Sequence, residues 1–401
     1  MIRGNVIIGQ SGGPTAVINS SLAGVIHAAK DSPGITGIYG MQFGIEGFMN
    51  ELLIDLGRQS EKVIKGLRST PSSALGSSRH KLVEKDFPVI LEVLKKYNIR
   101  YFFLIGGNDT MDTINRVEKY CRGKDYELIG TGIPKTVDND LFGTDHTPGF
   151  ASAARSNILN VMQAGVLARD MQKVDKFVVY QTIGRDSGWL ALATALAAKK
   201  EADAPHLIYG PEFPFDRDKF LSDVEKYINL YGYVSVVCGE GLKYADGTPV
   251  SQSATKDKFS NIEFGAMGGA SVGLNLHGMI HKEFGFRGEF QITESLIMSD
   301  IVRASKLDLQ EAYLCGTKAV EIAESGESGY MVSMIRLKNQ PYRIDYGKVL
   351  LGDVAVKAKP VPEDYYNEEG NYASRKFIEY MLPLAGELPE FTELEKIKPK
   401  I

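Results

Sequence analysis

The sequence has few cysteines, no long apolar run and no block of like charge. Cys121, Cys238 and Cys315 stand alone among 401 residues, with no C-x-x-C pair. This argues against a disulfide framework or a thiolate zinc site and indicates a reducing compartment. The longest apolar runs fall short of the roughly 18 residues that a membrane span needs, and the apolar N-terminal run is too short for a secretion signal. We therefore expect a cytoplasmic protein.

Excess charge of either sign is also missing. The 46 basic and 50 acidic residues give a net charge of −4. No lysine or arginine block of the kind that follows a nucleic-acid backbone or an anionic membrane is present, so neither partner is expected. Small anions remain possible ligands, because backbone amides bind phosphate without adding net charge.

Glycine, in contrast, is abundant. The 42 glycines are about fourteen more than an average usage near 7% would give. They show no collagen-like period and no Gly/Ser tract, so a fibrous or disordered chain does not explain them. Fourteen fall in or beside turns that are candidates for a site: Gly12, Gly13, Gly106, Gly107, Gly130, Gly132, Gly184, Gly188, Gly239, Gly241, Gly265, Gly268, Gly269 and Gly273.

Short β-branched or aromatic runs alternate with longer helical patterns, which is typical of βαβ units and mainly parallel sheets. We predict strands at 6–8, 101–105, 127–131, 176–181, 233–238, 284–291 and 330–337. Helices are predicted from Pro14 onward and at 111–120, 150–171, 189–198, 309–325 and 373–380. A chain of 401 residues exceeds one compact core, so we expect an α/β fold with two lobes and a boundary near Asp145.

Two glycine turns carry polar groups suited to phosphate. Gly12-Gly13 follows the first strand and precedes a helix, as an anion-binding nest would, although two glycines also serve as a plain tight turn. Neither a Walker A motif nor G-x-G-x-x-G is present there. Asn108 and Asp109 follow the second turn and could face a Mg²⁺-phosphate, while Asp109 and Thr110 could equally be helix N-caps.

The densest polar group of the sequence is Pro134-Lys135-Thr136-Val137-Asp138-Asn139-Asp140. A solvated loop is the simple interpretation, but the rigid Ile133-Pro134 pair beside it favours a functional site. Lysine can neutralise a transferring phosphoryl group, and an aspartate can accept the proton of an attacking hydroxyl. The segment thus holds both halves of phosphoryl transfer to an alcohol.

With these motifs the sequence resembles the phosphofructokinases, and among them the pyrophosphate-dependent branch. The resemblance covers nearly the whole chain, and Pro-x-Thr-x-Asp-Asn-Asp is its most specific part. Further matching motifs are the Ser-Gly-Gly turn, Gly76-Ser77-Ser78-Arg79, Gly-Gly-Asn-Asp-Thr, Ile-Gly-Arg, Gly-Glu-Gly, Asn367-Glu-Glu-Gly-Asn and Pro383-Leu-Ala-Gly-Glu-Leu-Pro.

The resemblance implies two Rossmann-like three-layer lobes. Residues 1–145 would form a lobe for pyrophosphate and Mg²⁺, completed by part of the C-terminal region. Residues 146–305 would form the sugar-phosphate lobe, and 306–401 would pack back on both. It also implies a homodimer or homotetramer, because family sites borrow residues from a neighbouring subunit.

The donor is indicated by two positions. ATP-dependent members carry small residues where this chain has Asp109 and Lys135. By resemblance, Asp109 fills the space and charge that the α-phosphate of ATP would need, and Lys135 stabilises the leaving phosphate. Pyrophosphate is therefore the expected donor.

Further roles are implied residue by residue. Asp138 resembles the base that activates the sugar 1-hydroxyl, and Asp140 occupies the second acidic position, where it tunes Asp138 or helps to place Mg²⁺. The other implied residues are Thr136, Val137, Ile183, Gly184, Arg185 and Glu240 around the sugar, with Arg185 near the transferring phosphoryl, and Gly12 and Gly13 at the donor.

The sequence departs from the family pattern at three places. Asn108 replaces a magnesium-linked aspartate, and Lys176 stands where many members have an arginine that crosses a subunit boundary. The Gln-Arg motif for the sugar phosphate is absent from 290–298, which leaves Arg287 and Arg303 as candidates for the 6-phosphate.

The resemblance implies reversible, Mg²⁺-dependent transfer from pyrophosphate to the 1-hydroxyl of fructose 6-phosphate, in glycolysis or gluconeogenesis. Three alternatives stay open: an ATP-dependent 6-phosphofructokinase, a pyrophosphate-dependent sedoheptulose 7-phosphate kinase, and a non-catalytic sensor of phosphate metabolites. The joint presence of Asp138, Lys135 and Arg185 counts against the sensor, which needs no base.

Overall fold

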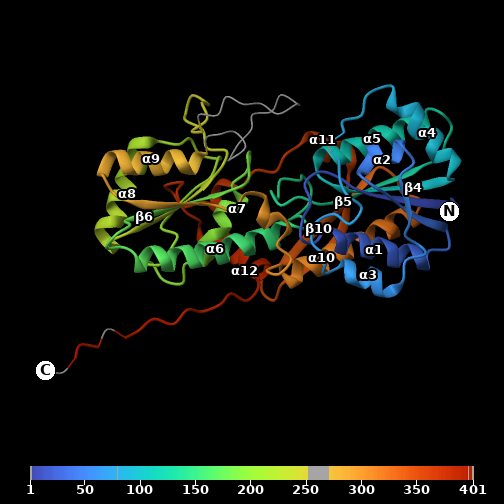
Figure 1. Cartoon of the computed structure of the whole chain (residues 1–401). Coiled ribbons are helices and arrows are strands. Elements are labelled where there is room, and N and C mark those ends of the chain that lie inside the picture. The colour runs from blue at the N-terminus through green and yellow to red at the C-terminus, as the bar shows by residue number, and fades with distance from the viewer. Residues whose placement is uncertain (1, 79, 252–270, 396, 400–401) are drawn as a thin grey trace.

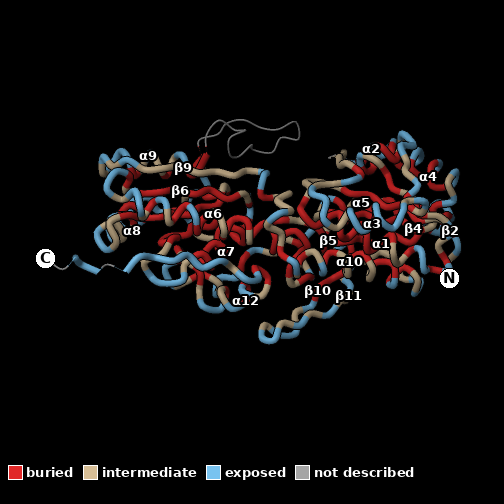
Figure 2. The backbone as a smooth tube through the Cα atoms, turned by 60° about the horizontal axis from the view of Figure 1, so that its bottom comes forward, coloured by how far each residue is buried: buried red, intermediate tan, exposed pale blue. Residues whose placement is uncertain are grey.

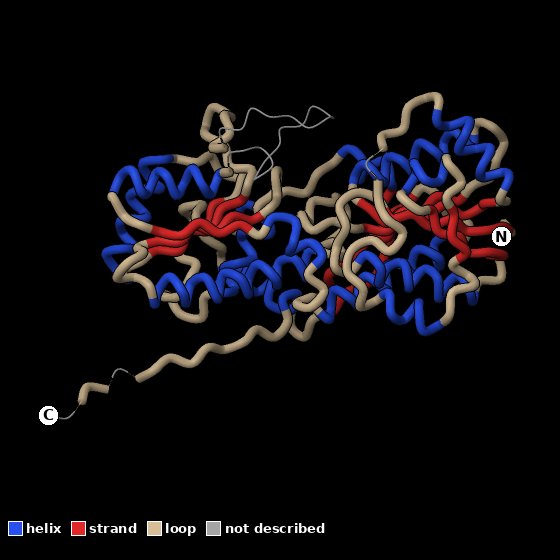
Figure 3. The backbone as a smooth tube through the Cα atoms, viewed as in Figure 1, coloured by secondary structure: helices blue, strands red, loops and turns tan. Residues whose placement is uncertain are grey.

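Two α/β lobes lie next to each other along the length of the molecule (Figure 1). The structure is a computed structural model, and it describes residues 2–78, 80–251, 271–395 and 397–399. Each lobe has three layers, with helices on both faces of a central sheet (Figure 3). The predicted fold class is thereby confirmed.

The first lobe contains a seven-stranded sheet in the order β11-β10-β5-β4-β1-β2-β3. The five central strands are parallel, and β11 and β3 pair antiparallel at the two edges. The strands are β1 (Gly4–Gln10), β2 (Ile35–Met41), β3 (Leu53–Asp55), β4 (Ile99–Gly106), β5 (Ile129–Pro134), β10 (Tyr330–Lys338) and β11 (Arg343–Leu350).

Both faces of this sheet are covered, which explains why its strands are apolar at successive positions. Val6 and Ile8 pack toward one face and Ile7 toward the other. The first face carries α1 (Ile18–Asp31), α3 (Glu61–Leu67) and α10 (Lys306–Glu324). The second carries α2 (Gly44–Met49), α4 (Asp86–Lys96), α5 (Asn108–Arg122) and α11 (Leu351–Val356). The buried strands form the centre of each lobe in Figure 2.

The second lobe is built on a smaller, wholly parallel sheet in the order β7-β8-β6-β9. Its strands are β6 (Phe177–Thr182), β7 (Leu207–Tyr209), β8 (Val234–Gly239) and β9 (Gly288–Ile292). One face carries α8 (Arg217–Tyr231) and α9 (Val272–Phe284). The other carries α6 (Phe150–Asp170), α7 (Trp189–Ala193), the 3-10 turn η1 (Thr194–Ala197) and α12 (Arg375–Ala385).

The C-terminal quarter of the chain divides between the lobes. The α10, β10, β11 and α11 elements belong to the first lobe, whereas η4 (Glu363–Tyr365) and α12 pack on the second. A further 3-10 turn, η3 (Glu294–Ser299), lies against α6. No helix in the described ranges is both long and apolar enough to cross a bilayer.

Several predicted boundaries were wrong. The first helix begins at Ile18, four residues after Pro14, because residues 11–17 form a turn first. The strand predicted at 127–131 is β5, from Ile129 to Pro134. Gly130 and Gly132, predicted beside a turn, lie inside β5, where α5 packs too closely for a Cβ.

The segment predicted as a strand at 284–291 begins with the end of a helix. Gly285 adopts the left-handed conformation and its amide bonds to the His281 carbonyl, which ends α9 before β9 begins at Gly288. The final helix spans 375–385 and not 373–380. The α2, α3, α4, α8, α11, β2, β3, β7 and β11 elements were not predicted.

Candidate active site

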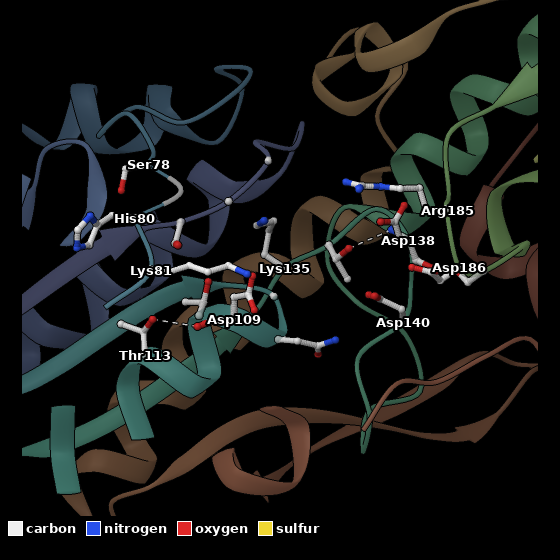
Figure 4. A pocket seen from close by; sticks show the side chains of 18 residues that line it. Ser78, His80, Lys81, Asp109, Thr113, Lys135, Asp138, Asp140, Arg185 and Asp186 are labelled. Atoms are coloured by element: carbon white, nitrogen blue, oxygen red, sulfur yellow. Dashed lines mark hydrogen bonds between the residues drawn. The ribbon is translucent and has the colours of Figure 1, made fainter. Parts of the chain in front are cut away.

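A cavity of about 530 Å³ opens at the carboxyl ends of β1, β4, β5 and β6, where the two lobes meet (Figure 4). Open parallel sheets place ligands at this edge. Nine residues predicted for the site line the cavity together: Gly12, Gly13, Asn108, Asp109, Lys135, Thr136, Asp138, Asp140 and Arg185. The sequence motifs, more than 170 residues apart along the chain, therefore meet in one place.

The turn after β1 brings backbone close to the Lys135 ammonium. Gly12 has φ = +76°, a conformation that favours glycine, and its carbonyl accepts a hydrogen bond of 2.6 Å from the Ser77 hydroxyl. A Cβ on Gly12 would lie 3.3 Å from Lys135 Nζ. A small residue here leaves room for an anion between the turn and the cation.

The turn after β4 resolves one of the alternatives left open by the sequence. The N-cap of α5 is Gly107, with no side-chain capping bond, so neither Asp109 nor Thr110 serves as the cap. Asp109 and Asn108 instead line the cavity. The Asn108 Oδ1 atom is shielded from solvent and accepts no hydrogen bond from the described residues.

The loop after β5 is folded tightly around its own backbone. The Asp138 amide donates to Thr136 Oγ1 at 3.1 Å, and Asn139 adopts a left-handed φ of +55°. The Ser187 hydroxyl donates to the Asp138 carbonyl at 2.9 Å, which ties this loop to the second lobe. These bonds hold the Asp138 carboxylate at the boundary between the lobes.

The carboxylates of this loop are unusually basic. The pKa of Asp138 is raised to about 7, mainly by burial and also by the nearby charges of Asp140 and Glu240, against the opposing charges of Arg185 and Lys135. Burial also raises the pKa of Asp140. A carboxylate with a pKa near 7 accepts a proton from a hydroxyl more readily than an ordinary one.

The second lobe contributes the loop that follows β6. Arg185 is exposed to the cavity, and the preceding Gly184 amide donates to Glu240 Oε1 at 3.1 Å. Burial raises the pKa of Glu240 to about 6, against the stabilising bond from Gly184. A Cβ on Gly241 would lie 1.7 Å from the Arg185 carbonyl oxygen, so Gly-Glu-Gly lets the two loops touch.

Four predicted residues lie behind the cavity wall. Val137 is 4% exposed and belongs to the second lobe's core, and Ile183 packs against the same cluster. The Gly184 amide bonds to Glu240. The two residues affect the cavity indirectly, because Gly184 precedes Arg185 and the charge of Glu240 acts on Asp138. They support the loops that line the cavity.

Neither arginine proposed for the 6-phosphate lines the cavity. Arg303 Nη1 donates to Asn160 Oδ1 at 2.5 Å, and its Nε lies 3.8 Å from Asp300. Arg287 pairs with Asp175 at 3.3 Å and is 75% exposed. It precedes β9, which runs parallel to β6, so it lies at the end of the sheet opposite Arg185.

The segment where the Gln-Arg motif was expected contributes an apolar group. Met298 lies so close to Gly13 that a Cβ there would be 2.7 Å from the Met298 methyl carbon. The Glu294 charge acts on Glu240 and raises its pKa. The part of the site where the Gln-Arg motif was expected therefore has a methyl group and carboxylates.

Five lining residues, His80, Lys81, Thr113, Asp186 and Ser187, were not predicted. His80 and Lys81 directly follow the Gly76-Ser77-Ser78-Arg79 motif, which was the available signal. Arg79 itself, and Gly265, Gly268 and Gly269 of the other glycine-rich stretch, lie outside the described residues. No group of three or more His, Cys, Asp or Glu side chains within the described ranges is arranged to hold a metal on its own.

Comparison with known proteins gives one consistent family. The family profile described as Phosphofructokinase matches residues 5–323. The chain is 36% identical to a pyrophosphate–fructose 6-phosphate 1-phosphotransferase of Halomonas elongata, over 100% of this chain and 96% of that protein. A protein of the same name from Methylococcus capsulatus is 34% identical over 98% of this chain and 96% of the other.

A solved structure agrees with the sequence relatives. The crystal structure of a pyrophosphate-dependent phosphofructokinase from Nitrosospira multiformis superposes with a TM-score of 0.87 and 34% identity, covering 98% of this chain and 95% of the other. The two-lobed fold described above is thus shared over nearly the full length of both proteins.

Proposed function

The chain belongs to the phosphofructokinase family, and from that premise we propose that it transfers a phosphoryl group reversibly from pyrophosphate to the 1-hydroxyl of fructose 6-phosphate. The observation that carries the proposal is the meeting of Asp109, Lys135 and Asp138 in one cavity between the lobes. The names of the relatives supply the two substrates.

The first lobe would hold the donor. The Gly12-Gly13 turn offers backbone amides, and the Lys135 ammonium next to it balances the charge of pyrophosphate. Asp109 lines the region beyond, where a third phosphate would meet a carboxylate. Like charges in a poorly solvated site repel, so pyrophosphate is favoured over ATP.

The second lobe would hold the sugar, with the reacting hydroxyl directed at Asp138. The carboxylate takes the hydroxyl proton while the oxygen forms a bond to the terminal phosphorus of pyrophosphate. The bridging P–O bond breaks and phosphate leaves with its electrons, stabilised by Lys135. Arg185, exposed to the cavity between Asp138 and the sugar side, balances charge on the phosphoryl group in flight.

Magnesium fits this site through the first lobe. The Asn108 Oδ1 atom has no hydrogen-bond partner among the described residues, and Asp109 and Asp140 add carboxylate oxygens along the cavity. Mg²⁺ prefers a few protein oxygens together with water and phosphate oxygens. When bound, the ion would neutralise charge on the phosphate oxygens of the donor.

Three further parts of the proposal concern its setting. The direction of the reaction would follow metabolite levels, in glycolysis or gluconeogenesis. The three cysteines are free and buried, which suits a reducing cytoplasm. We also propose a homodimer or homotetramer, since no arginine of this chain lines the sugar side apart from Arg185 within the described residues.

A coupled assay tests the donor and the acceptor together. With fructose 6-phosphate and Mg²⁺, turnover should be faster with pyrophosphate than with ATP at equal concentration, and faster than with sedoheptulose 7-phosphate as acceptor. Chelation of Mg²⁺ should abolish it. Faster turnover with ATP would overturn the donor assignment, and tight pyrophosphate binding without turnover would favour a sensor.

A further inference from the structure

One lysine far along the chain reaches the loop that carries Asp138. Lys359 Nζ donates to Asn139 Oδ1 at 3.1 Å, and to the carbonyl oxygens of Thr144 and Asp145 at 3.0 and 2.7 Å. Three hydrogen bonds use the full donor capacity of an ammonium. The lysine side chain therefore connects Asn139, within the loop, to residues 144–145 at its end.

The backbone of the same segment also pairs with the loop. The Lys359 amide donates to the Asp140 carbonyl at 2.8 Å, and Ala358 forms an antiparallel bridge with Leu141. The Lys359 carbonyl accepts from Trp189 Nε1 at 3.3 Å, at the start of α7. One residue thus connects the loop after β5 with the helix that follows Arg185.

The loop needs such an external hold. Asn139 is fully buried and has φ = +55°, a left-handed conformation that costs about 1 kcal/mol or more in a residue other than glycine. Its side chain accepts the Lys359 bond, while its neighbours on either side, Asp138 and Asp140, face the cavity. Fixing Asn139 therefore fixes the direction of both carboxylates.

We propose that Lys359 is a positioning residue for phosphoryl transfer, which acts by holding Asn139 and the 144–145 carbonyls so that Asp138 meets the acceptor hydroxyl. The inference rests on the proposed function for its effect on turnover. Its structural half, that the lysine fixes the loop, stands on the contacts alone. Burial lowers the pKa of Lys359 to about 7 while the charges of Asp145 and Asp140 oppose this, and the positive charge of the protonated lysine in turn favours the ionised Asp140 carboxylate.

The test compares Lys359→Met with Lys357→Met. Both lysines lie on the same segment, but the Lys357 side chain is 47% exposed, and its ammonium contacts Asp353 at 3.0 Å and lies 4.5 Å from the centre of the Phe142 ring, three positions beyond Asn139. In Lys359→Met, kcat should fall about 100-fold, because displacing a catalytic group by about 1 Å causes a loss of that size. The KM values for pyrophosphate and fructose 6-phosphate should stay within about threefold, and Lys357→Met should match the wild type.

Hydrogen exchange supplies a readout that does not need turnover. Amides 136–140 should exchange faster in Lys359→Met than in Lys357→Met, while amides of β1 and β4 stay unchanged. If the wild type shows no activity with pyrophosphate, the proposed function fails, and this exchange comparison still decides whether Lys359 holds the loop. Exchange that rises across both lobes would mean a general structural role and would overturn the inference.

A second variant covers the case in which Lys359→Met does not fold. Asn139→Gly keeps the left-handed backbone at no steric cost but removes the oxygen that Lys359 contacts. Asn139→Gly should lower kcat and leave KM unchanged. Lys359→Arg, which keeps the charge and the donors, should lose less kcat than Lys359→Met. A kcat within threefold of the wild type in Asn139→Gly or Lys359→Met would overturn the inference.

Discussion

The two sides of the cavity differ in how they are built. On the donor side, Gly12, Asn108, Asp109 and Lys135 all follow strands of one seven-stranded sheet and line the cavity directly. On the acceptor side, Arg185 comes from a four-stranded sheet and is supported by Glu240 from behind. The proposed donor site is thus assembled on one sheet, while the proposed sugar site is assembled by contacts between loops.

The two sides of the cavity also differ in the charged and polar groups that they carry. The donor side pairs backbone amides with a buried ammonium, which suits two phosphates. The acceptor side carries Asp138, Glu240 and Glu294 with a methyl group from Met298, and one cation, Arg185, among the described lining residues. The side chains that we propose for the donor therefore line the cavity, whereas Arg287 and Arg303 do not.

The largest effect should come from the group at the junction. Asp138→Asn removes the base but keeps the size and most of the hydrogen bonding, so kcat should fall about 10³- to 10⁴-fold. Acceptor binding, measured by calorimetry, should change little. Asp112→Asn on the exposed face of α5 is the matched control. A rate within tenfold of the wild type would remove Asp138 as the base.

A change confined to the donor side should alter donor choice. Asp109→Gly with Lys135→Gly removes the carboxylate that excludes a third phosphate and the cation that binds the leaving group. The kcat/KM for pyrophosphate should fall about 100-fold, and the ratio of ATP to pyrophosphate use should rise. Lys124→Gly with Asp125→Gly, an exposed pair after α5, is the control. An unchanged ratio would contradict the donor assignment.

The pH dependence separates the base from its neighbours. Asp138 must be ionised to accept a proton, and burial raises its pKa to about 7. The kcat/KM should therefore fall about tenfold for each pH unit below 7. Asp140→Asn removes a neighbouring negative charge, which lowers the Asp138 pKa and should move the acidic limb down by roughly one pH unit. An unmoved limb would exclude Asp140 as the group that tunes the base.

The smallest effect on turnover should come from a change at His146, between the two lobes. His146 is fully buried and contacts Asp145 and Glu311 at 2.7 Å each. Burial alone would lower its pKa, but the two carboxylates outweigh burial and raise it to about 9. The protonated ring therefore stabilises the fold by about 3 kcal/mol at most below pH 6.5, and this is lost as the pH rises through 9.

Thermal unfolding of His146→Gln tests whether protonated His146 stabilises the fold. The difference in Tm from the wild type should be large at pH 6 and small at pH 9.5. The exposed His281, whose ring bonds to the Phe286 carbonyl, provides the control substitution His281→Gln. A difference that grows with pH would show that His146 is neutral in the folded protein.

The sequence predicted which residues of the first lobe line the cavity, because the signals for them are local. Gly12-Gly13, Asn108-Asp109 and Lys135 each lie within a few residues of the end of a strand, so strand prediction alone brings them to one edge. Where the pattern was weaker, the boundaries moved: Pro14 precedes α1 by a whole turn, and Gly285 ends α9 inside a predicted strand.

What the sequence did not predict depends on contacts between distant segments. Lys359 lies 220 positions from Asn139, in a stretch with no motif of its own, and only the folded chain brings the two together. Arg287 illustrates the opposite failure, because a suitable residue type in a suitable segment lies at the wrong end of the sheet. Residue type is local, whereas the direction of a side chain is set by the whole lobe.

The order of strands in the first sheet also affects how the protein is made. β10 pairs with β5, although β5 ends at Pro134 and β10 begins only at Tyr330, 196 positions later (330 − 134). At about 5–20 residues per second, translation leaves the β5 edge without its neighbour for roughly 10–40 seconds. The second lobe, which is nearly complete in sequence by then, can fold first, so a chaperone that shields an open sheet edge should associate with ribosomes translating residues 134–350.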